Sequence, residues 1–293
     1  MKKSILSLNF LLFITSSISF SQNIYDNGLF TGDYASTYIN GNKKAVGRLE
    51  QNQRVGKWEF YGDDGKLVAK IDYHSNTEFK TLETQNNESN ALNIPLKGYD
   101  RLFQLPLEEK DIIWTKRLYR DIPASEFNLS QEFDFFGRVN AIQTDKILYF
   151  VDNEFREKLQ NPDGIPHSKE IITGYRIKLD YFFRTDFNFM DFRIVGIAPL
   201  YQTSEGNTKE ICWLYYHGLK DVVFEKIVNK EGKSMEDILQ TKNYHSIIYK
   251  ETNVADKTIE EISKNEQEQK AFYLEIDHSI IDTENEYIIK AYL

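Results

Sequence analysis

The sequence predicts an α+β protein in which a small antiparallel β-hairpin repeat module precedes a mixed α+β domain. Residues 28–74 are strand-like throughout and contain an Asn-Gly and an Asp-Gly dipeptide, which favour hairpin turns. Residues 175–183 alternate apolar and polar side chains, as in a strand with one buried face. Two capping-box motifs between further strand-like segments favour α+β over a parallel α/β fold.

Residues 1–21 have the three parts of an export signal. Lys2 and Lys3 supply the positive start, a mostly apolar stretch follows, and Ser19 and Ser21 match the small-x-small pattern that a signal peptidase reads. The apolar stretch is shorter than the ~20 residues that a membrane span needs, so an uncleaved anchor is the weaker alternative. We therefore expect an exported, periplasmic chain with no transmembrane segment after cleavage, and outer-membrane association as a further option.

Composition limits the function classes. The 293-residue chain has a formal net charge of −9, which becomes −11 once Lys2 and Lys3 are removed. Such a chain is poorly suited to nucleic acid, whose phosphates need basic patches. Cys212 is the single cysteine, which excludes an internal disulfide, and its neighbours Ile211 and Trp213 are apolar. We expect Cys212 to be a buried structural thiol.

The first module is expected to span residues 22–74. Its dipeptides at 40–41 and 64–65 predict the two hairpin turns, and Tyr38 and Tyr61 begin similar units about 23 residues apart. The sequence GKWEFYGDDGKL at 56–67 resembles the MORN-like repeats of YwqK-type proteins. Two such units bury little surface, so the module should depend on the rest of the chain or on a partner.

Residues 75–96 are polar and are expected to form a linker, and residues 97–293 the α+β domain. Within this domain the pattern predicts a helix over 145–159 and short helices that begin at Ser234 and Thr258. Strands are expected at 175–183, 192–201 (ended by Pro199), 210–216 and 244–250, and the alternating tail at 272–293 is expected to add an edge strand.

The sequence does not bring catalytic groups together. Its five histidines are scattered, and the Gly-x-Ser-x-Gly elbow, the phosphate-binding loop and the dinucleotide fingerprint do not occur. We therefore assign no catalytic residue, no metal ligand and no cofactor. An enzyme whose site is assembled only in three dimensions remains an alternative, as does a metal site from distant residues.

A contact surface is the stronger candidate for function. The stretch IIWTKRLYRDI at 112–122 mixes aromatic and apolar side chains with three cations, and Arg and aromatic residues are enriched at interfaces. The partner-binding candidates are Trp114, Lys116, Arg117, Tyr119 and Arg120. Charge reversal at Arg117 and Arg120 should then abolish partner binding without unfolding. The alternative is an ordinary amphipathic element at helical spacing, with Trp114 facing the core and the cations facing water.

Several motifs in order carry a family resemblance. GYRIKLDYFF at 174–183, RIVGIAP at 193–199, DIL at 237–239 and HSIIYKE at 245–251 resemble the gliding motility / Por secretion protein N (GldN/PorN) family of the type IX secretion system. Residues 114–123 resemble the family's Trp-x-Lys-x-x-Trp-Arg-x-Ile-Asp element, with Tyr119 in place of its second Trp and Pro123 in place of its Asp. The resemblance spans about 111–262, whereas the hairpin module and the tail depart from the family.

The resemblance implies a non-enzymatic periplasmic assembly part that acts by protein–protein contact. Its implied partners are the outer-membrane ring lipoprotein and the periplasmic domain of the inner-membrane motor subunit, and no cofactor is implied. A second hypothesis is an exported MORN-like binding module that recognises a protein or membrane surface, carried on a repurposed scaffold of this family.

Overall fold

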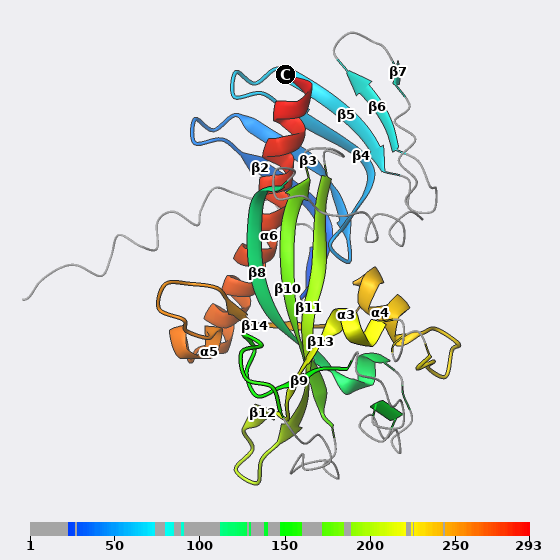
Figure 1. The fold of residues 1–293 in the computed structure, drawn as a ribbon. Helices are drawn as coiled ribbons and strands as arrows, with labels where there is room; N and C mark the ends of the chain where they lie inside the picture. Colours follow the sequence, from blue (N-terminus) through cyan, green and yellow to red (C-terminus); the bar gives the residue numbers. More distant parts are fainter. Residues whose placement is uncertain are drawn as a thin grey trace, which may run out of the picture. The chain divides into compact units, whose positions relative to one another are not determined.

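The computed structural model describes residues 23–26, 28–73, 112–127, 129, 138–139, 147–159, 172–184, 189–220, 224, 226–242 and 244–293, and the backbone of 80–84 and 89–90. The chain divides into two compact units. The first contains Met1–Ile24, Phe30–Leu96 and Tyr292–Leu293, and the second contains Tyr25–Leu29 and Lys97–Ala291. The predicted α+β class is confirmed (Figure 1), and the expected export signal at 1–21 lies outside the described residues.

The first sheet follows the chain, with its strands side by side in sequence order. Neighbouring strands from β2 onward are antiparallel, as expected for successive hairpins. The strands are β1 (Ile24–Asp26), β2 (Leu29–Thr37), β3 (Lys43–Glu50), β4 (Gln53–Tyr61), β5 (Leu67–Tyr73), β6 (Lys80–Thr84) and β7 (Ser89–Asn90). The last two strands lie within residues 75–96, where the sequence analysis expected a polar linker.

The two predicted hairpin turns are confirmed and share one geometry. Between β2 and β3, the Tyr38 N–H donates to the Asn42 carbonyl at 2.8 Å and the Gly41 N–H donates to the Tyr38 carbonyl at 2.9 Å. Gly41 has φ 87°, a left-handed conformation that glycine adopts without strain. The loop Gly62–Lys66 between β4 and β5 repeats these bonds, with Gly65 at φ 79°.

Gly47 lies inside β3, where the register with β4 shifts. A Cβ at this position would lie 2.2 Å from the Trp58 ring, so only glycine leaves room for the indole. Trp58 is fully buried, and its Nε1–H donates to the Arg48 carbonyl at 3.1 Å. The glycine and the tryptophan therefore form one packing unit in the first sheet.

The second sheet is antiparallel, in the order β14-β8-β10-β11-β13-β9, with β12 also paired to β11. Figure 1 shows its long strands β8, β10 and β11 side by side. The strands are β8 (Ile112–Pro123), β9 (Tyr149–Phe150), β10 (Gly174–Arg184), β11 (Phe189–Gln202), β12 (Thr208–Glu210), β13 (Trp213–Tyr215) and β14 (Ile247–Glu251).

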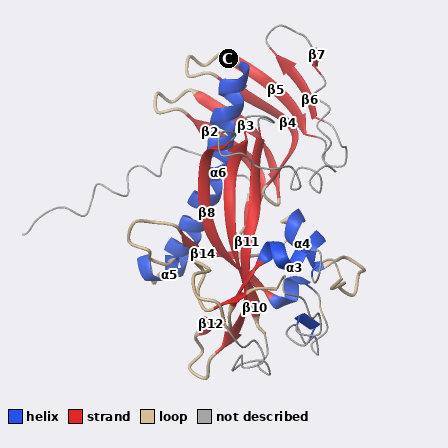
Figure 2. Cartoon of the chain, viewed as in Figure 1, coloured by secondary structure: helices blue, strands red, loops and turns tan. Residues whose placement is uncertain are grey.

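Both predicted capping boxes are confirmed. Ser234 caps α4 (Met235–Thr241) and Thr258 caps α5 (Ile259–Ile262), each with reciprocal bonds to the residue three positions on. The other helices are η3 (Ala124–Phe127), α3 (Tyr216–Leu219) and α6 (Glu266–Tyr292). In the view of Figure 2, α5 lies to the left of the long strands and α3 and α4 lie to their right, and residues of α4 and α6 belong to the same hydrophobic core cluster.

The tail is a helix, so the prediction of an edge strand at 272–293 is wrong. α6 runs for 27 residues and buries Ile276, Ile280 and Ile288 at helical spacing. The Ile residues that suggested a strand fall on this buried stripe, together with the polar Asp277 and Asn285. Packing of the stripe therefore overrides the β propensity of its members.

The helix predicted over 145–159 is also wrong. Tyr149 and Phe150 form β9, and the chain then turns back so that the Leu159 N–H donates to the Tyr149 carbonyl at 2.9 Å. The Asp152 carboxylate accepts from the Glu154 N–H at 2.7 Å, a local bond that competes with helix formation. The apolar spacing at these positions reflects a folded loop.

Two strand boundaries also differ from the prediction. β11 continues through Pro199 to Gln202, and the Pro199 carbonyl accepts a bond from the Ile211 N–H at 2.9 Å. The single strand expected over 210–216 is divided into β12 and β13. The interruption at Ile211 and Cys212 allows this segment to follow β11 past the proline.

Candidate functional site

The five partner-binding candidates lie on a strand, β8, so the alternative of helical spacing is wrong. Side chains alternate between the two faces of a sheet. Trp114, Lys116 and Arg120 therefore point to one face, and Arg117 and Tyr119 point to the other. The strand brings the five residues together in sequence but separates them across the sheet.

The first face carries the main core of the second unit. It includes Leu118, Ile122, Ile177, Leu179, Ile197, Leu214, Ile238, Leu239, Ile276 and Ile280. Arg120 lies on this face with 5% of its surface exposed and forms an ion pair with Asp277 of α6. Burial raises the pKa of the Asp277 carboxyl, and the charge of Arg120 opposes that shift. Arg120 thus holds α6 to the sheet, and reversing its charge would unfold the unit rather than test a surface.

The segment Tyr25–Leu29 belongs to the same unit. The Tyr25 hydroxyl is buried close to Asp277, and burial and that charge raise its pKa. Asp26 lies 3.3 Å from the His245 Nε2 atom, and a Cβ on Gly28 would lie 2.3 Å from the Ser246 carbonyl oxygen. A short N-terminal segment is therefore an integral part of the domain's packing.

The second face of the sheet carries a ladder of buried and partly buried charge pairs. Arg117 donates to both carboxylate oxygens of Asp180 at 2.6 and 2.8 Å. Arg176 donates to both oxygens of Asp121 at 2.6 and 2.7 Å, and to Glu210 at 2.6 Å. In each bidentate pair the two residues lie directly opposite each other on β8 and β10, so the register of the strands sets the pairing.

Aromatic rings cover the cations of this ladder. The Arg176 guanidinium lies 3.1 Å from the centre of the Tyr249 ring. The Lys178 ammonium lies 5.1 Å from the Phe155 ring centre and 5.7 Å from that of Tyr119. Burial lowers the pKa of Lys178, and the charge of Arg117 lowers it further.

The loop after β9 closes over the ladder. The Lys178 ammonium donates to the Asn153 carbonyl at 2.6 Å, and Phe155 (φ 57°) rests on Gly196 of β11. A Cβ at Gly196 would lie 2.4 Å from the Phe155 ring, so the glycine of the Gly-Ile-Ala-Pro motif leaves the space in which this ring packs. The family-like motif therefore has a packing role.

Exposure divides the five predicted residues into two groups. Tyr119 and Arg120 are buried, at 3% and 5% exposure. Trp114 is half-buried, and the side chains of Lys116 and Arg117 are 19% and 37% exposed. Direct contact with a partner therefore depends on Trp114, Lys116 and Arg117.

The buried charges of β10 were not among the residues predicted from the sequence. Arg176 and Lys178 occupy the polar positions of the alternating strand, which the half-buried pattern assigned to solvent. Both are almost fully buried, at 3% and 2% exposure. A signal did exist, because Asp121 lies on a strand-like segment at a position that can oppose Arg176.

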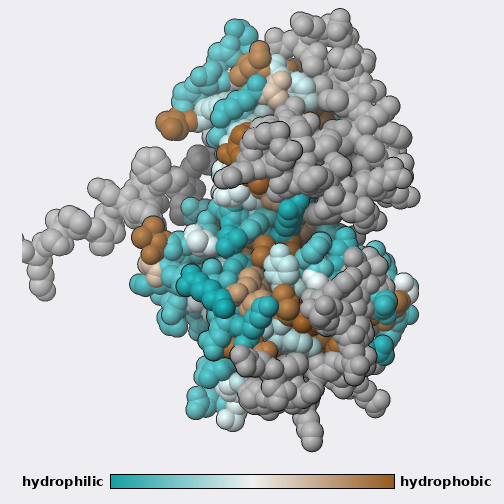
Figure 3. Space-filling model, viewed as in Figure 1, coloured by the Kyte–Doolittle hydropathy of each residue, from teal (hydrophilic) through white to brown (hydrophobic). Residues whose placement is uncertain are grey.

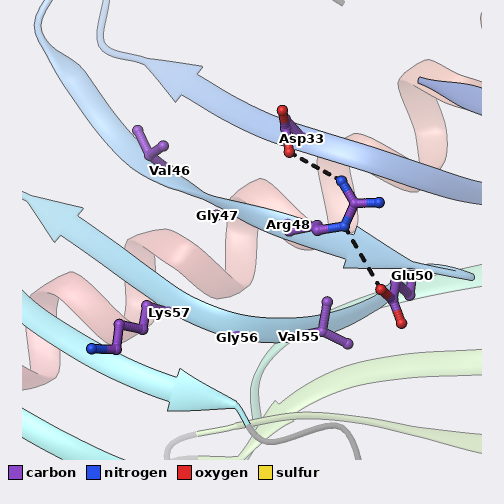
Figure 4. A pocket seen from close by; sticks show the side chains of 8 residues that line it. All are labelled: Asp33, Val46, Gly47, Arg48, Glu50, Val55, Gly56 and Lys57. Carbon is purple, nitrogen blue, oxygen red and sulfur yellow. Dashed lines mark hydrogen bonds and ion pairs between the residues drawn. The ribbon is translucent and has the colours of Figure 1, made fainter. Parts of the chain in front are cut away.

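The first unit holds an open pocket of about 610 Å³ on its sheet (Figure 4). Gly47 and Gly56 are among its lining residues; the space beside Gly56 is open, whereas the Trp58 ring occupies the space beside Gly47, and Val46 and Val55 contribute apolar groups. Arg48 lies at its edge and forms ion pairs with Asp33 at 3.3 Å and Glu50 at 3.7 Å. The remaining lining residue is Lys57. The pocket therefore combines an open glycine position, two apolar side chains and a charged rim.

The described residues were also compared with the requirements of a metal site and of a membrane-spanning helix. No group of three His, Cys, Asp or Glu side chains converges within them, and none of their helices is long and apolar enough to span a membrane. Cys212 is buried as predicted, and burial raises the pKa of its thiol to about 12. Figure 3 shows hydrophobic residues in small groups among hydrophilic ones on the visible face.

Comparison with protein families identifies the larger domain. The model of the gliding motility associated protein GldN family matches residues 134–288, just over half of the chain. The match includes most of α6, so the tail does not depart from the family as expected, whereas the hairpin module and β8 precede the matched residues. No curated protein matches the chain. Through its second unit, the chain belongs to the gliding motility associated protein GldN family.

Proposed function

We propose that the protein is a non-enzymatic, exported component of the gliding-motility and type IX secretion machinery, acting in the periplasm by protein–protein contact. Family membership supports this role. The observation that supports the non-enzymatic part is that the buried and partly buried cations of the second sheet are paired within the chain. Four cations of the sheet are each bonded to a carboxylate of the same chain: Arg117, Arg120, Arg176 and Lys178. These ion pairs stabilise a rigid second sheet.

The proposed partners are the outer-membrane ring lipoprotein and the periplasmic domain of the inner-membrane motor subunit. A rigid sheet is suited to binding these partners, because a pre-organised surface loses little conformational entropy on binding. Trp114, Lys116 and Arg117 are the accessible members of the predicted contact surface, and no cofactor is needed for such contacts.

Affinity measurements with the two purified partners test the proposal. The wild-type chain should bind at least one of them, and Arg117→Glu should weaken that binding at least tenfold. Lys264→Glu is the matched control, because it reverses an exposed charge on the segment after α5. Failure of the wild type to bind either partner would contradict the proposed function.

The pocket of the first unit favours a second candidate, a binding module that recognises a protein or membrane surface. Deleting the whole module would also remove Tyr25 from the second unit, so point variants are the cleaner test. Arg48→Glu changes the rim of the pocket, and Lys66→Glu changes an exposed turn away from it. If Arg48→Glu alone removes the envelope proteins that copurify with the chain, the module carries the binding function.

A further inference from the structure

β14 covers only part of the edge of β8. β10 pairs with β8 from Ile112 to Pro123, whereas β14 pairs with it only from Leu118 to Asp121. The last bond on the β14 side runs from the Thr252 N–H to the Arg117 carbonyl at 3.2 Å. Within the described part of the chain, residues Ile112–Lys116 have a strand neighbour on one side only. We call these five residues the open edge.

The direction of the backbone groups follows from that last bond. Arg117 points its carbonyl toward β14, and in a regular strand every second residue points its N–H and C=O to the same side. The register from Thr115 to Arg117 is regular, so the N–H and C=O of Thr115 also point to the open side. The side chain of Thr115 is exposed, which leaves room for an incoming strand.

The turn that follows β14 is stabilised by side-chain hydrogen bonds and leaves the edge open. The Asn253 side chain donates to the carbonyls of Glu251 and Lys257, both at 2.8 Å, and accepts from the Lys257 N–H at 3.1 Å. These three bonds direct the chain away from β8 directly after Thr252 and toward α5. The side-chain bonds of Asn253 therefore set the end of β14. Beyond that end, no strand of the described residues lies beside this edge of β8.

The usual protection of an edge strand is weak at this place. Charged side chains that reach into solvent and prolines normally block strand addition. The open edge has no proline, and its single charge, Lys116, is bonded to Glu251 and to Ser279, both at 2.8 Å. The exposed Ile113 side chain adds an apolar contact, and a register shift there ends the regular edge.

We propose that the open edge binds an extended segment of a partner protein by strand addition, antiparallel to β8 and in line with β14. The proposal rests on the proposed function and states how that contact is made. The segment should carry an apolar side chain beside Ile113 and Thr115, and a carboxylate for the Arg117 guanidinium. Asp180 takes two of the five N–H donors of Arg117, whose side chain is 37% exposed.

A second copy of the chain fits this edge less well. Pairing of two open edges about a twofold axis would place the irregular Ile113 of one copy opposite a regular residue of the other, either Thr115 or Arg117, depending on the position of the axis. Both copies would also carry a net charge of −9. A partner segment with its own acidic residue meets neither difficulty and complements Arg117.

Thr115→Pro tests the proposal, because it removes the N–H that points to the open side and leaves the ladder with β10 intact. Thr115→Val is the matched control, since it keeps the N–H and the shape of the side chain. The probes are the purified ring lipoprotein and the motor periplasmic domain. Thr115→Pro should weaken the binding that the wild type shows at least tenfold, and Thr115→Val should change it less than threefold.

The outcomes separate the two proposals. Equal binding by the wild type and Thr115→Pro overturns strand addition and leaves the proposed function standing, whereas a wild type that binds neither probe overturns both. Hydrogen exchange of the isolated chain adds a second measurement. A protected Thr115 amide would mean that the chain covers its own edge, and a dimer that Thr115→Pro dissolves would place a second copy there; either result overturns the partner assignment.

Discussion

The two sheets use charged side chains in opposite ways. On the first sheet, the ion pairs of Arg48 with Asp33 and Glu50 lie at the surface, with half or more of each side chain exposed. On the second sheet, Arg120 and Arg176 are almost fully buried, and each is bonded to carboxylates far away in the sequence. Exposed pairs contribute little to stability, whereas a buried charge that loses its partner is costly. The comparison predicts that charge substitutions will damage the second unit far more than the first.

The largest effect is expected at Arg120. Arg120→Met leaves Asp277 buried without its cation and should lower the free energy of unfolding by about 3–5 kcal/mol. Denaturant unfolding of the variant measures this loss. The matched change on the first sheet, Arg48→Met, should cost less than about 0.5 kcal/mol because its pair is exposed. Similar losses for the two variants would contradict the comparison.

A double variant sharpens the same point. Replacing both members, with Arg120→Met and Asp277→Leu, removes the buried charges together and should cost less than Arg120→Met alone. A double variant as unstable as the single one would mean that the pair acts through packing rather than through charge.

The next largest effect is expected where Phe155 rests on Gly196. Phe155→Ala removes the ring that closes the loop after β9 and should cost about 2–4 kcal/mol in unfolding free energy. Val151→Ala on the same loop is the control and should change stability by less than about 0.5 kcal/mol, because Val151 is exposed. Equal losses of unfolding free energy in the two variants would show that the packing of Phe155 on Gly196 does not stabilise the loop over the charged face.

A smaller effect is expected at the start of α4. Ser234→Ala removes the side-chain oxygen that accepts from the Asp237 N–H at 3.0 Å and should cost about 1 kcal/mol. Thermal unfolding of the variant beside Ser234→Asp, which restores an acceptor, measures the contribution of the cap. No difference between the two variants would contradict a capping role.

The smallest effect concerns proton binding on the first sheet. The Lys70 and Tyr61 bonds lower the pKa of Glu59, and the bond to Glu59 raises the pKa of Tyr61 to about 12. The Glu59 contribution to stability should be present above its ordinary pKa of 4.5 and be lost as the pH falls through the lower native value. The Tyr61 contribution should be present below pH 10 and be lost as the pH rises toward 12.

An NMR titration of Tyr61 checks this prediction. Glu59→Gln should bring the pKa of Tyr61 back toward 10, because the negative acceptor is gone. Glu50→Gln, an exposed change on β3, should leave the titration as it is. An unchanged pKa in Glu59→Gln would mean that burial rather than the hydrogen bond sets the shift.

Local signals in the sequence predicted local structure well. The two hairpin turns and the two capping boxes each depend on residues within five positions of one another, so a short window contains the whole cause. The alternating face of β10 was predictable for the same reason. The family-like motifs likewise pointed to the domain that the GldN model matches.

The failures arose where distant residues decide the outcome. Residues 149–159 fold back as a loop because Lys178 and Gly196, on other strands, receive Asn153 and Phe155. The tail is helical because its Ile stripe meets the core of the second sheet. The burial of Arg120 depends on Asp277, 157 positions away, which no pattern around residue 120 reveals.

The buried thiol of Cys212 is expected to react only slowly with thiol-specific reagents. With a pKa of about 12, only on the order of one thiol in 100,000 is ionised at neutral pH, compared with a few per cent of ordinary thiols. Maleimides and disulfide-forming reagents attack the thiolate, so the natural chain should resist both without any substitution. A cysteine introduced at Thr115 would then be the reactive group of the chain, and a spin label or fluorophore placed there could follow the open edge of β8 during assembly in a native envelope.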